Sequence, residues 1–143
     1  MLDDCLKPAI RLIPPRVCPS LKAAPRIRDM YWCQFPEDAQ LPELWKKRPV
    51  IVLSPNNTLS GAVTVVPCTT QDQGNSKWAY KLQTSIDGTN SWAICDKPST
   101  FAVSRLRIPS CGRLRVSEQE FVEILRRVLG WLPSLEKTLE KMG

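Results

Sequence analysis

The residues best suited to chemistry begin with a cluster of positive charge, Lys46-Lys47-Arg48-Pro49, where a polar, proline-marked loop enters an apolar run. Such a junction holds a guanidinium firmly while its head stays open to a ligand, and the planar fork of arginine fits a phosphate with two parallel hydrogen bonds. The other interpretation is a solvated basic cluster at the start of a strand, and spacing alone favours it.

Two further candidates stand at predicted strand ends. Thr69 and Thr70, followed by Gln71, end an apolar strand, where a threonine hydroxyl can donate to a phosphoryl oxygen. More often such threonines only satisfy backbone groups. Asp96 follows a later strand, where a carboxylate serves either as a base or, more commonly, as a turn residue. The neighbouring Cys95 fits a core position better than a nucleophile.

Four arginines with period-two spacing follow near the end of the chain: Arg105, Arg107, Arg113 and Arg115. In a hairpin this spacing places each pair on one face, with the apolar residues between them facing inward. No acidic residue lies between positions 97 and 117, so the set either tracks a phosphate backbone or forms a solvated face. Three aromatic strand residues can stack on bases, although core packing suits most of them better: Trp78, Tyr80 and Trp92.

The chain has no histidine, which excludes Ser-His-Asp and Cys-His nucleophiles and His-ligated zinc. Any catalysis must use Arg, Lys, Asp, Glu, Tyr, Thr, Ser or Cys. The 6 cysteines contain no C-x-x-C pair, so the sequence predicts no zinc ribbon, no metal site and no cofactor. Without an export signal, we expect reduced and mostly buried thiols.

Composition indicates one globular domain, with 143 residues of which 43% are hydrophobic and 24% charged. No apolar run approaches the roughly 18 residues that a membrane span needs, and we expect a cytoplasmic protein with no membrane partner. The net charge of +6 is concentrated in residues 1–28, which hold six basic and two acidic side chains. A basic balance favours RNA, DNA or an acidic partner without choosing among them.

The chain divides into a proline-rich basic N-terminal arm (1–28) and a domain over 29–143. The domain alternates short β-type runs with turn residues, which predicts a mainly β small barrel or sandwich. The expected strands lie at 30–35, 49–53, 62–66, 78–82, 91–94, 104–108 and 112–116, the last two forming one hairpin.

One strong helix is expected late in the chain, over 117–130. Ser117 with Glu120 makes a capping box, apolar residues then repeat with helical period, and Gly130 ends the helix. A short helical tail follows Pro133.

The order of these segments resembles the MazF/PemK (Kid-like) toxin family over roughly residues 28 to 130. MYWCQF, a proline-marked loop and KRPVIVLS resemble the family's opening, VVPCTTQ its next strand, and AICDKPST followed by SRL its later "CDQPRT" region. The Arg-Pro and Pro-x-Thr-x-Gln elements carry the resemblance most. The arm has no counterpart in it.

This resemblance implies an SH3-like small barrel with a C-terminal α-helix. It also implies a sequence-specific, metal-independent endoribonuclease, an mRNA interferase, that cleaves single-stranded RNA by attack of the 2′-hydroxyl. The expected partners are RNA, a cognate antitoxin and a second copy in a homodimer, with DNA bound only by the toxin-antitoxin complex.

By the family pattern, Arg48 and Thr69 match the catalytic arginine and threonine, and Asp96 matches an acidic residue of the PemK-type branch. The expected RNA-binding residues are Lys46, Lys47, Thr70, Gln71, Arg105 and Arg107. Ile94 stands where that branch has an arginine, so its proton-donating role has no occupant. RNA carries its own nucleophile, so a fixed cation and a neutral donor suit the task without histidine.

Two other functions remain open at this stage. One is a non-catalytic SH3-like module that binds nucleic acid or protein and derives from the same family, having lost activity through changes such as Ile94. The other is a DNA-binding regulator that uses the arginine hairpin, although no predicted helix is basic on one face. RNA cleavage by the purified protein in the presence of a chelator would distinguish the endoribonuclease from both of these alternatives.

Overall fold

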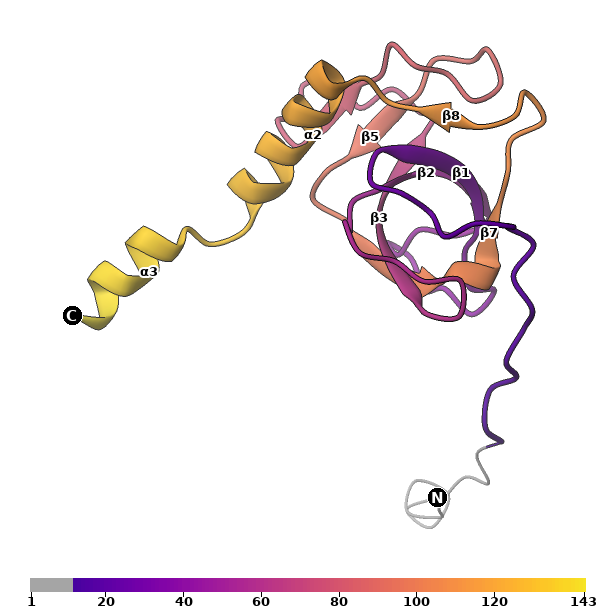
Figure 1. Ribbon diagram of the computed structural model, residues 1–143. Coiled ribbons are helices and arrows are strands. Elements are labelled where there is room, and N and C mark those ends of the chain that lie inside the picture. The colour runs from indigo at the N-terminus through magenta and orange to yellow at the C-terminus, as the bar shows by residue number, and fades with distance from the viewer. Residues whose placement is uncertain (1–11) are drawn as a thin grey trace, which may run out of the picture.

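The structure, a computed structural model, describes residues 12–143 and consists mainly of antiparallel strands followed by two helices (Figure 1). The strands are β1 (Asp29–Gln34), β2 (Lys47–Val52), β3 (Ala62–Thr69), β4 (Ala79–Lys81), β5 (Trp92–Ile94), β6 (Ser99–Ala102), β7 (Leu106–Arg107) and β8 (Leu114–Arg115). A 3-10 turn, Val103–Arg105, joins β6 to β7, and the helices are α2 (Glu118–Trp131) and α3 (Leu135–Met142).

The strands form one sheet in the order β4-β5-β3-β2-β1-β7, with β6 also paired to β3 and β8 also paired to β1. The first half of β3 pairs with β6, which leads through the 3-10 turn into β7 on the far edge of β1. The sheet therefore curls into a half-barrel, visible nearly end-on in Figure 1. The predicted mainly β barrel with a C-terminal helix is confirmed.

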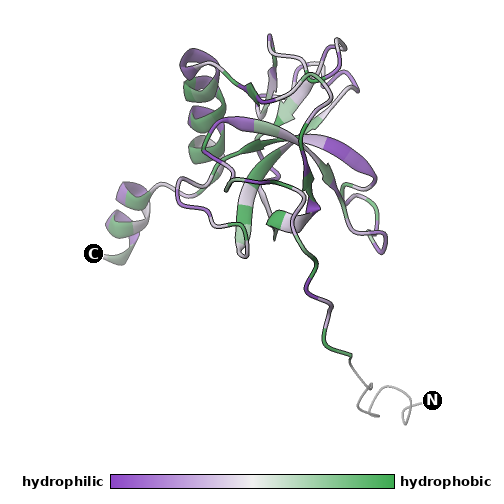
Figure 2. Cartoon of the chain, turned by 45° about the vertical axis from the view of Figure 1, so that its right-hand side comes forward, coloured by the Kyte–Doolittle hydropathy of each residue, from purple (hydrophilic) through white to green (hydrophobic). Residues whose placement is uncertain are grey.

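Two apolar clusters hold this sheet, one on each face. The inner cluster fills the curl with residues of β1, β2, β3 and the β6–β7 connection, among them Tyr31, Cys33, Val50, Val65 and Leu106. The outer cluster lies between the sheet and α2, whose apolar side faces the strands (Figure 2). Because side chains alternate across a strand, neighbouring residues of β2 and β3 serve different clusters.

The predicted hairpin over 104–116 is wrong. β7 and β8 do not pair with each other; both lie antiparallel along one edge of β1, and β7 meets Trp32 and Cys33 while β8 meets Asp29 and Met30. The physical reason is that β1 offers an unpaired edge long enough for both segments, while Pro109 lacks a donor for a ladder between them.

Strand β6 was not expected, because its sequence Ser-Thr-Phe-Ala has no β-type alternation of its own. It forms because the first half of β3 has a free edge there, and four residues of each strand pair in register. Tertiary pairing outweighs local propensity at this position.

Helix α2 begins as predicted, since the Ser117 Oγ accepts from the Glu120 backbone N–H at 3.2 Å. The Glu120 carboxylate does not return to the cap, however. It is 4% exposed and accepts at 2.6 Å from both the Gln83 backbone N–H and the Thr84 hydroxyl, which anchors the β4–β5 loop.

The predicted stop at Gly130 is also wrong, because α2 runs through it to Trp131. The helix ends at Leu132, whose extended backbone (ψ 153°) is the conformation that the following Pro133 requires. The predicted helical tail is confirmed as α3, which extends away from the barrel (Figure 1). No helix within residues 12–143 is long and apolar enough to cross a membrane.

Residues 12–28 contain no helix or strand, and their first residues lead away from the barrel (Figure 1), while positions 1–11 of the predicted arm lie outside the described residues. From Arg16 onward this segment contacts the barrel. Leu21 is buried in the inner cluster, and the Ser20 hydroxyl donates to the Leu106 carbonyl at 3.0 Å.

Candidate functional site

One row of side chains crosses four neighbouring strands and contains the two strongest sequence candidates. The pairing of β2 with β3, continued by two residues, sets Arg48 opposite Thr69. The adjoining strands set Trp92 opposite Thr69 and Lys81 opposite Trp92. Opposed residues of an antiparallel sheet project from the same face, so a cation, a hydroxyl, an indole and a second cation follow one another.

Arg48 is held by its own loop. Its Nε donates to the Trp45 carbonyl at 2.9 Å, and the left-handed backbone of Lys46 (φ 65°) turns the chain back so that this carbonyl can accept. The residue is only 9% exposed, and this burial lowers the pKa of its guanidinium, yet arginine stays charged in proteins. Neither terminal nitrogen has a partner within residues 12–143, so both can donate to an anion.

Thr69 ends β3 with its side chain 8% exposed. Its Oγ1 accepts from the Gln71 backbone N–H at 3.2 Å, which uses a lone pair and leaves the hydroxyl hydrogen free to donate. The sequence left two roles open for Thr69, a partner for the backbone and a donor to a phosphoryl oxygen. The geometry allows both, because the hydroxyl oxygen accepts from the backbone while its hydrogen stays available.

Asp96 lies apart from this pair within one chain. It follows β5 at the end opposite Trp92, on the order of 10 Å along the strand, and its carboxylate lies 3.7 Å from Lys97 Nζ. Neighbouring Ile94 is buried. Burial raises the pKa of the Cys95 thiol to about 12, so this cysteine is a core residue rather than a nucleophile.

The remaining RNA-binding candidates occupy two places. Lys46, Thr70 and Gln71 are exposed in the loops that flank Arg48 and Thr69. The other three, Lys47, Arg105 and Arg107, line a hollow of about 650 Å³ together with Trp32 and the arm. This second group lies on the outer face, since Lys47 precedes Arg48 on β2 and projects from the opposite side.

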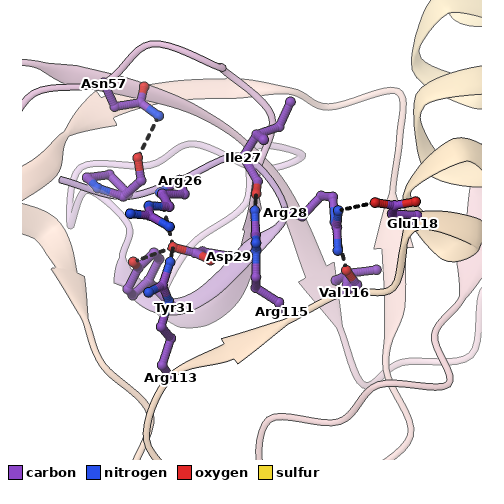
Figure 3. Close-up of polar contacts among 11 residues, drawn as sticks. Arg26, Ile27, Arg28, Asp29, Tyr31, Asn57, Arg113, Arg115, Val116 and Glu118 are labelled. Carbon is purple, nitrogen blue, oxygen red and sulfur yellow. Dashed lines mark hydrogen bonds and ion pairs between the residues drawn. The ribbon is translucent and has the colours of Figure 1, made fainter. Parts of the chain in front are cut away.

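Arg115 of β8 and Arg113 just before that strand are engaged in the fold (Figure 3). Arg115 Nε lies 3.2 Å and Arg113 Nη2 3.6 Å from the carboxylate of Asp29, which is 1% exposed. The same carboxylate accepts from the Tyr31 hydroxyl at 2.9 Å and from the Arg26 backbone N–H at 3.0 Å. Arg113 and Arg115 therefore compensate the buried charge of Asp29 and stabilise the start of β1.

Sequence reasoning missed two members of these sites. Lys81 is not among the sequence candidates, and Trp32 enters the sequence prediction as a strand-forming aromatic alone. For Trp92 the sequence leaves two roles open, base stacking and core packing. The available signal was alternation, which puts Lys81 on the face opposite the core-facing Tyr80.

No group of three or more His, Cys, Asp or Glu side chains that could hold a metal ion occurs within residues 12–143. The described cysteines carry no disulfide; Cys33, Cys68 and Cys95 are buried, and Cys18 and Cys111 are exposed.

The curled sheet with a C-terminal helix defines a small SH3-like barrel, and solved structures share it. MazF from Deinococcus radiodurans has a TM-score of 0.60 at 17% identity, covering 75% of this chain and 94% of that one. An endoribonuclease from a Mycobacterial species, in complex with its cognate antitoxin, has a TM-score of 0.57 at 19% identity, covering 78% and 99%. The Mycobacterium tuberculosis toxin MazF-mt6 has a TM-score of 0.53 at 20% identity, covering 73% and 95%.

Comparison of the sequence with models of protein families identifies the family as well as the fold. Residues 26–132 match the family described as PemK-like, MazF-like toxin of type II toxin-antitoxin system, and the chain therefore belongs to this family. The match leaves out most of the arm and α3. The curated protein sequences gave no match.

Proposed function

We propose that this toxin is an endoribonuclease that cuts single-stranded RNA at short sequences without a metal ion and is neutralised by a cognate antitoxin. Family membership supports this, as do structural neighbours described as endoribonucleases, one of them in complex with its antitoxin. The observation that carries the proposal is that Arg48 and Thr69 lie on adjacent strands, two residues beyond the Val50–Pro67 pair, each with donors that have no partner within residues 12–143.

The reaction needs little more than alignment and charge stabilisation, because the substrate supplies the nucleophile. The 2′-oxygen bonds to the adjacent phosphorus and the bond to the 5′-oxygen breaks, which yields a 2′,3′-cyclic phosphate and a 5′-hydroxyl. The 2′-hydroxyl proton leaves to a base and a proton reaches the departing 5′-oxygen. In this proposal Arg48 and Thr69 donate to the phosphoryl oxygens, whose negative charge grows in the transition state.

Trp92 and Lys81 extend the same row, and we assign them the neighbouring nucleotide. An indole offers a stacking face to a base, and an ammonium compensates a phosphate. Sequence preference then comes from the polar loop that follows Thr69, where Thr70 and Gln71 are exposed. A homodimer with the RNA groove across or beside the subunit interface completes the proposal, and light scattering of an active sample tests it.

The proposal is tested by Arg48→Ala and Thr69→Ala, assayed on single-stranded RNA in a chelator. Loss of one preorganised donor costs about 10²–10³ in rate, and the charged Arg48 should cost more than Thr69. Arg48→Lys should also fail, because a point charge cannot reproduce the fork. Arg126→Gln, an exposed charge change on α2, is the matched control and should cleave normally. Wild-type cleavage by Arg48→Ala would refute the site.

The variant Asp96→Asn tests whether Asp96 is the base that accepts the 2′-hydroxyl proton. If Asp96 accepts the 2′-hydroxyl proton, cleavage collapses while RNA binding persists. If its carboxylate only pairs with Lys97, the loss is small.

One observation favours the second candidate, a non-catalytic binding module: the buried Ile94 leaves the PemK-type arginine position without a proton donor. RNA binding by the wild-type protein without any cleavage in chelator would establish that alternative.

A further inference from the structure

The hollow on the outer face of β1 and β2, about 650 Å³ in volume, has the chemistry of a binding site. Three cations, Lys47, Arg105 and Arg107, line it together with Trp32 and with arm residues between 14 and 17. No acidic side chain lines it within residues 12–143. Sites for small ligands span about 300–1,000 Å³, so one nucleotide fits.

We propose that this hollow is a subsite for a nucleotide of single-stranded RNA outside the bond that is cut, and that the N-terminal arm forms one of its walls. The inference rests on the proposed function and adds to it a role for the arm, most of which lies outside the family match.

The three cations are held in place, and none of them pairs with an acidic side chain within residues 12–143. Lys47 Nζ lies 4.8 Å from the centre of the Trp32 ring. Arg105 Nη1 donates to the Gln34 carbonyl at 3.2 Å, and Arg107 Nη1 donates to the Ser104 carbonyl at 2.7 Å. Carbonyl acceptors orient a guanidinium and leave its full charge for a phosphate, whereas a carboxylate would cancel it.

The arm is attached to the barrel within the segment that faces the hollow and again just after it. Arg16 Nη1 donates to the Ser60 carbonyl at 3.0 Å, and Ser20 donates to Leu106 at 3.0 Å. Between the first attachment and the chain start lie Pro14 and Pro15, whose rings fix the backbone. A rigid wall loses little conformational entropy when a ligand binds.

The position of the hollow matches a path for RNA. Lys47 and Arg48 are consecutive at the start of β2 and project from opposite faces, so a strand that passes around this end meets both. A second hollow of about 620 Å³ beside the β1–β2 loop is lined by two acids, Asp38 and Glu43, and one cation, Lys97, so its net charge does not favour a phosphate. The charges therefore favour the first hollow.

The test measures binding separately from cleavage. The probe is a mixed-sequence single-stranded RNA with 2′-O-methyl groups throughout, which removes the nucleophile, and its Kd is followed by fluorescence anisotropy from 50 to 200 mM salt. Lys47→Gln should weaken binding about five- to tenfold at low salt and reduce the salt slope by about 0.7. Lys77→Gln is the matched control, because Lys77 Nζ lies 4.7 Å from the Trp78 ring outside the hollow, and its Kd should match the wild type.

The wall is tested without a change in charge. Replacing Pro14 and Pro15 together by glycine should weaken binding about threefold and leave the salt slope unchanged, because glycine loosens the exposed backbone without changing its charge. Wild-type affinity in this variant, or equal effects of Lys47→Gln and Lys77→Gln, would overturn the subsite.

Two further outcomes also overturn it. The first is that a poly-glutamate peptide binds in a Lys47-dependent way while the RNA does not, which makes the hollow a polypeptide site. The second is that the wild type neither binds nor cleaves RNA, which refutes the proposed function as well. Failure of the subsite alone is distinguishable, because Arg48-dependent cleavage of unmodified RNA then persists.

Discussion

The sequence Arg-Leu-Arg followed by a β-branched residue occurs twice, at 105–108 and 113–116, and the two copies have different environments. Both lie along the same edge of β1. The second copy meets Asp29, whereas within the described residues the first meets backbone carbonyls and a serine hydroxyl and no carboxylate. The position that each copy takes along β1, and not the arginine spacing, decides which pair stays available to a ligand.

The difference follows from the cost of burying a charge. Asp29 is almost completely buried at the start of β1, and a buried carboxylate requires cations or donors. Its Oδ1 accepts no aligned hydrogen bond, so the 3.2 Å approach of Arg115 Nε compensates it by charge. Arg113 and Arg115 are therefore part of the fold, whereas Arg105 and Arg107 have no acidic partner within residues 12–143.

The largest expected effect comes from removing the carboxylate. Asp29→Ala should destabilise the protein by about 3 kcal/mol, because the Tyr31 hydroxyl and the Arg26 N–H lose their acceptor and two arginines lose their counter-charge. Urea unfolding measures this loss. Asp29→Asn, which keeps an acceptor oxygen, should recover part of it. A variant as stable as the wild type would show that the two copies do not differ as described.

The next largest effects are expected from one substitution in each copy of the Arg-Leu-Arg sequence, which should change different properties. Arg115→Gln should cost about 1–2 kcal/mol of stability, since its guanidinium serves both Asp29 and the Ile27 carbonyl, and should leave RNA affinity unchanged. Arg107→Gln should weaken RNA binding about fivefold and change stability by less than about 0.5 kcal/mol. Equal effects on both measurements would remove the distinction.

The fold was predictable where local signals and tertiary pairing agree. The buried run of β2, the Ser117 cap and the helix after it are visible in the sequence, and the structure contains each of them. The wrong hairpin and the missing β6 have one common cause. Both depend on free edges of β1 and β3, and an edge is a property of the assembled sheet that no local pattern encodes.

The candidate site follows the same division. Arg48 and Thr69 are recognisable as residue types at strand ends, and the motif order places them in a family. Their opposition, and the continuation of the row to Trp92 and Lys81, come from strand register. Register depends on long-range pairing, which no local pattern shows. The opposite faces of Lys47 and Arg48 were missed for another reason: the expected strand starts at residue 49, whereas β2 starts at Lys47.

The smallest effect concerns the Tyr31 hydroxyl, which donates to Asp29 at 2.9 Å. Burial, then this hydrogen bond and the charge of Asp29, raise the pKa of Tyr31 well above its ordinary value. In the unfolded chain a tyrosine ionises near pH 10, whereas folded Tyr31 stays neutral there. Stability from this group is therefore complete below about pH 10 and is lost as the pH rises further.

Tyr31→Phe removes that pH dependence. At pH 8 the variant should be less stable by about 1 kcal/mol, the value of one hydrogen bond. Above pH 10 the wild type should lose about 1.4 kcal/mol per pH unit more than the variant, so the two unfolding free energies converge near pH 11. The buried thiols of Cys33, Cys68 and Cys95, whose pKa values are also raised, act in both proteins and cancel in the difference. Parallel urea unfolding curves up to pH 11 would show that Tyr31 is not coupled to the Asp29 cluster, and the contrast between the two arginine pairs would then rest on the ion pairs alone.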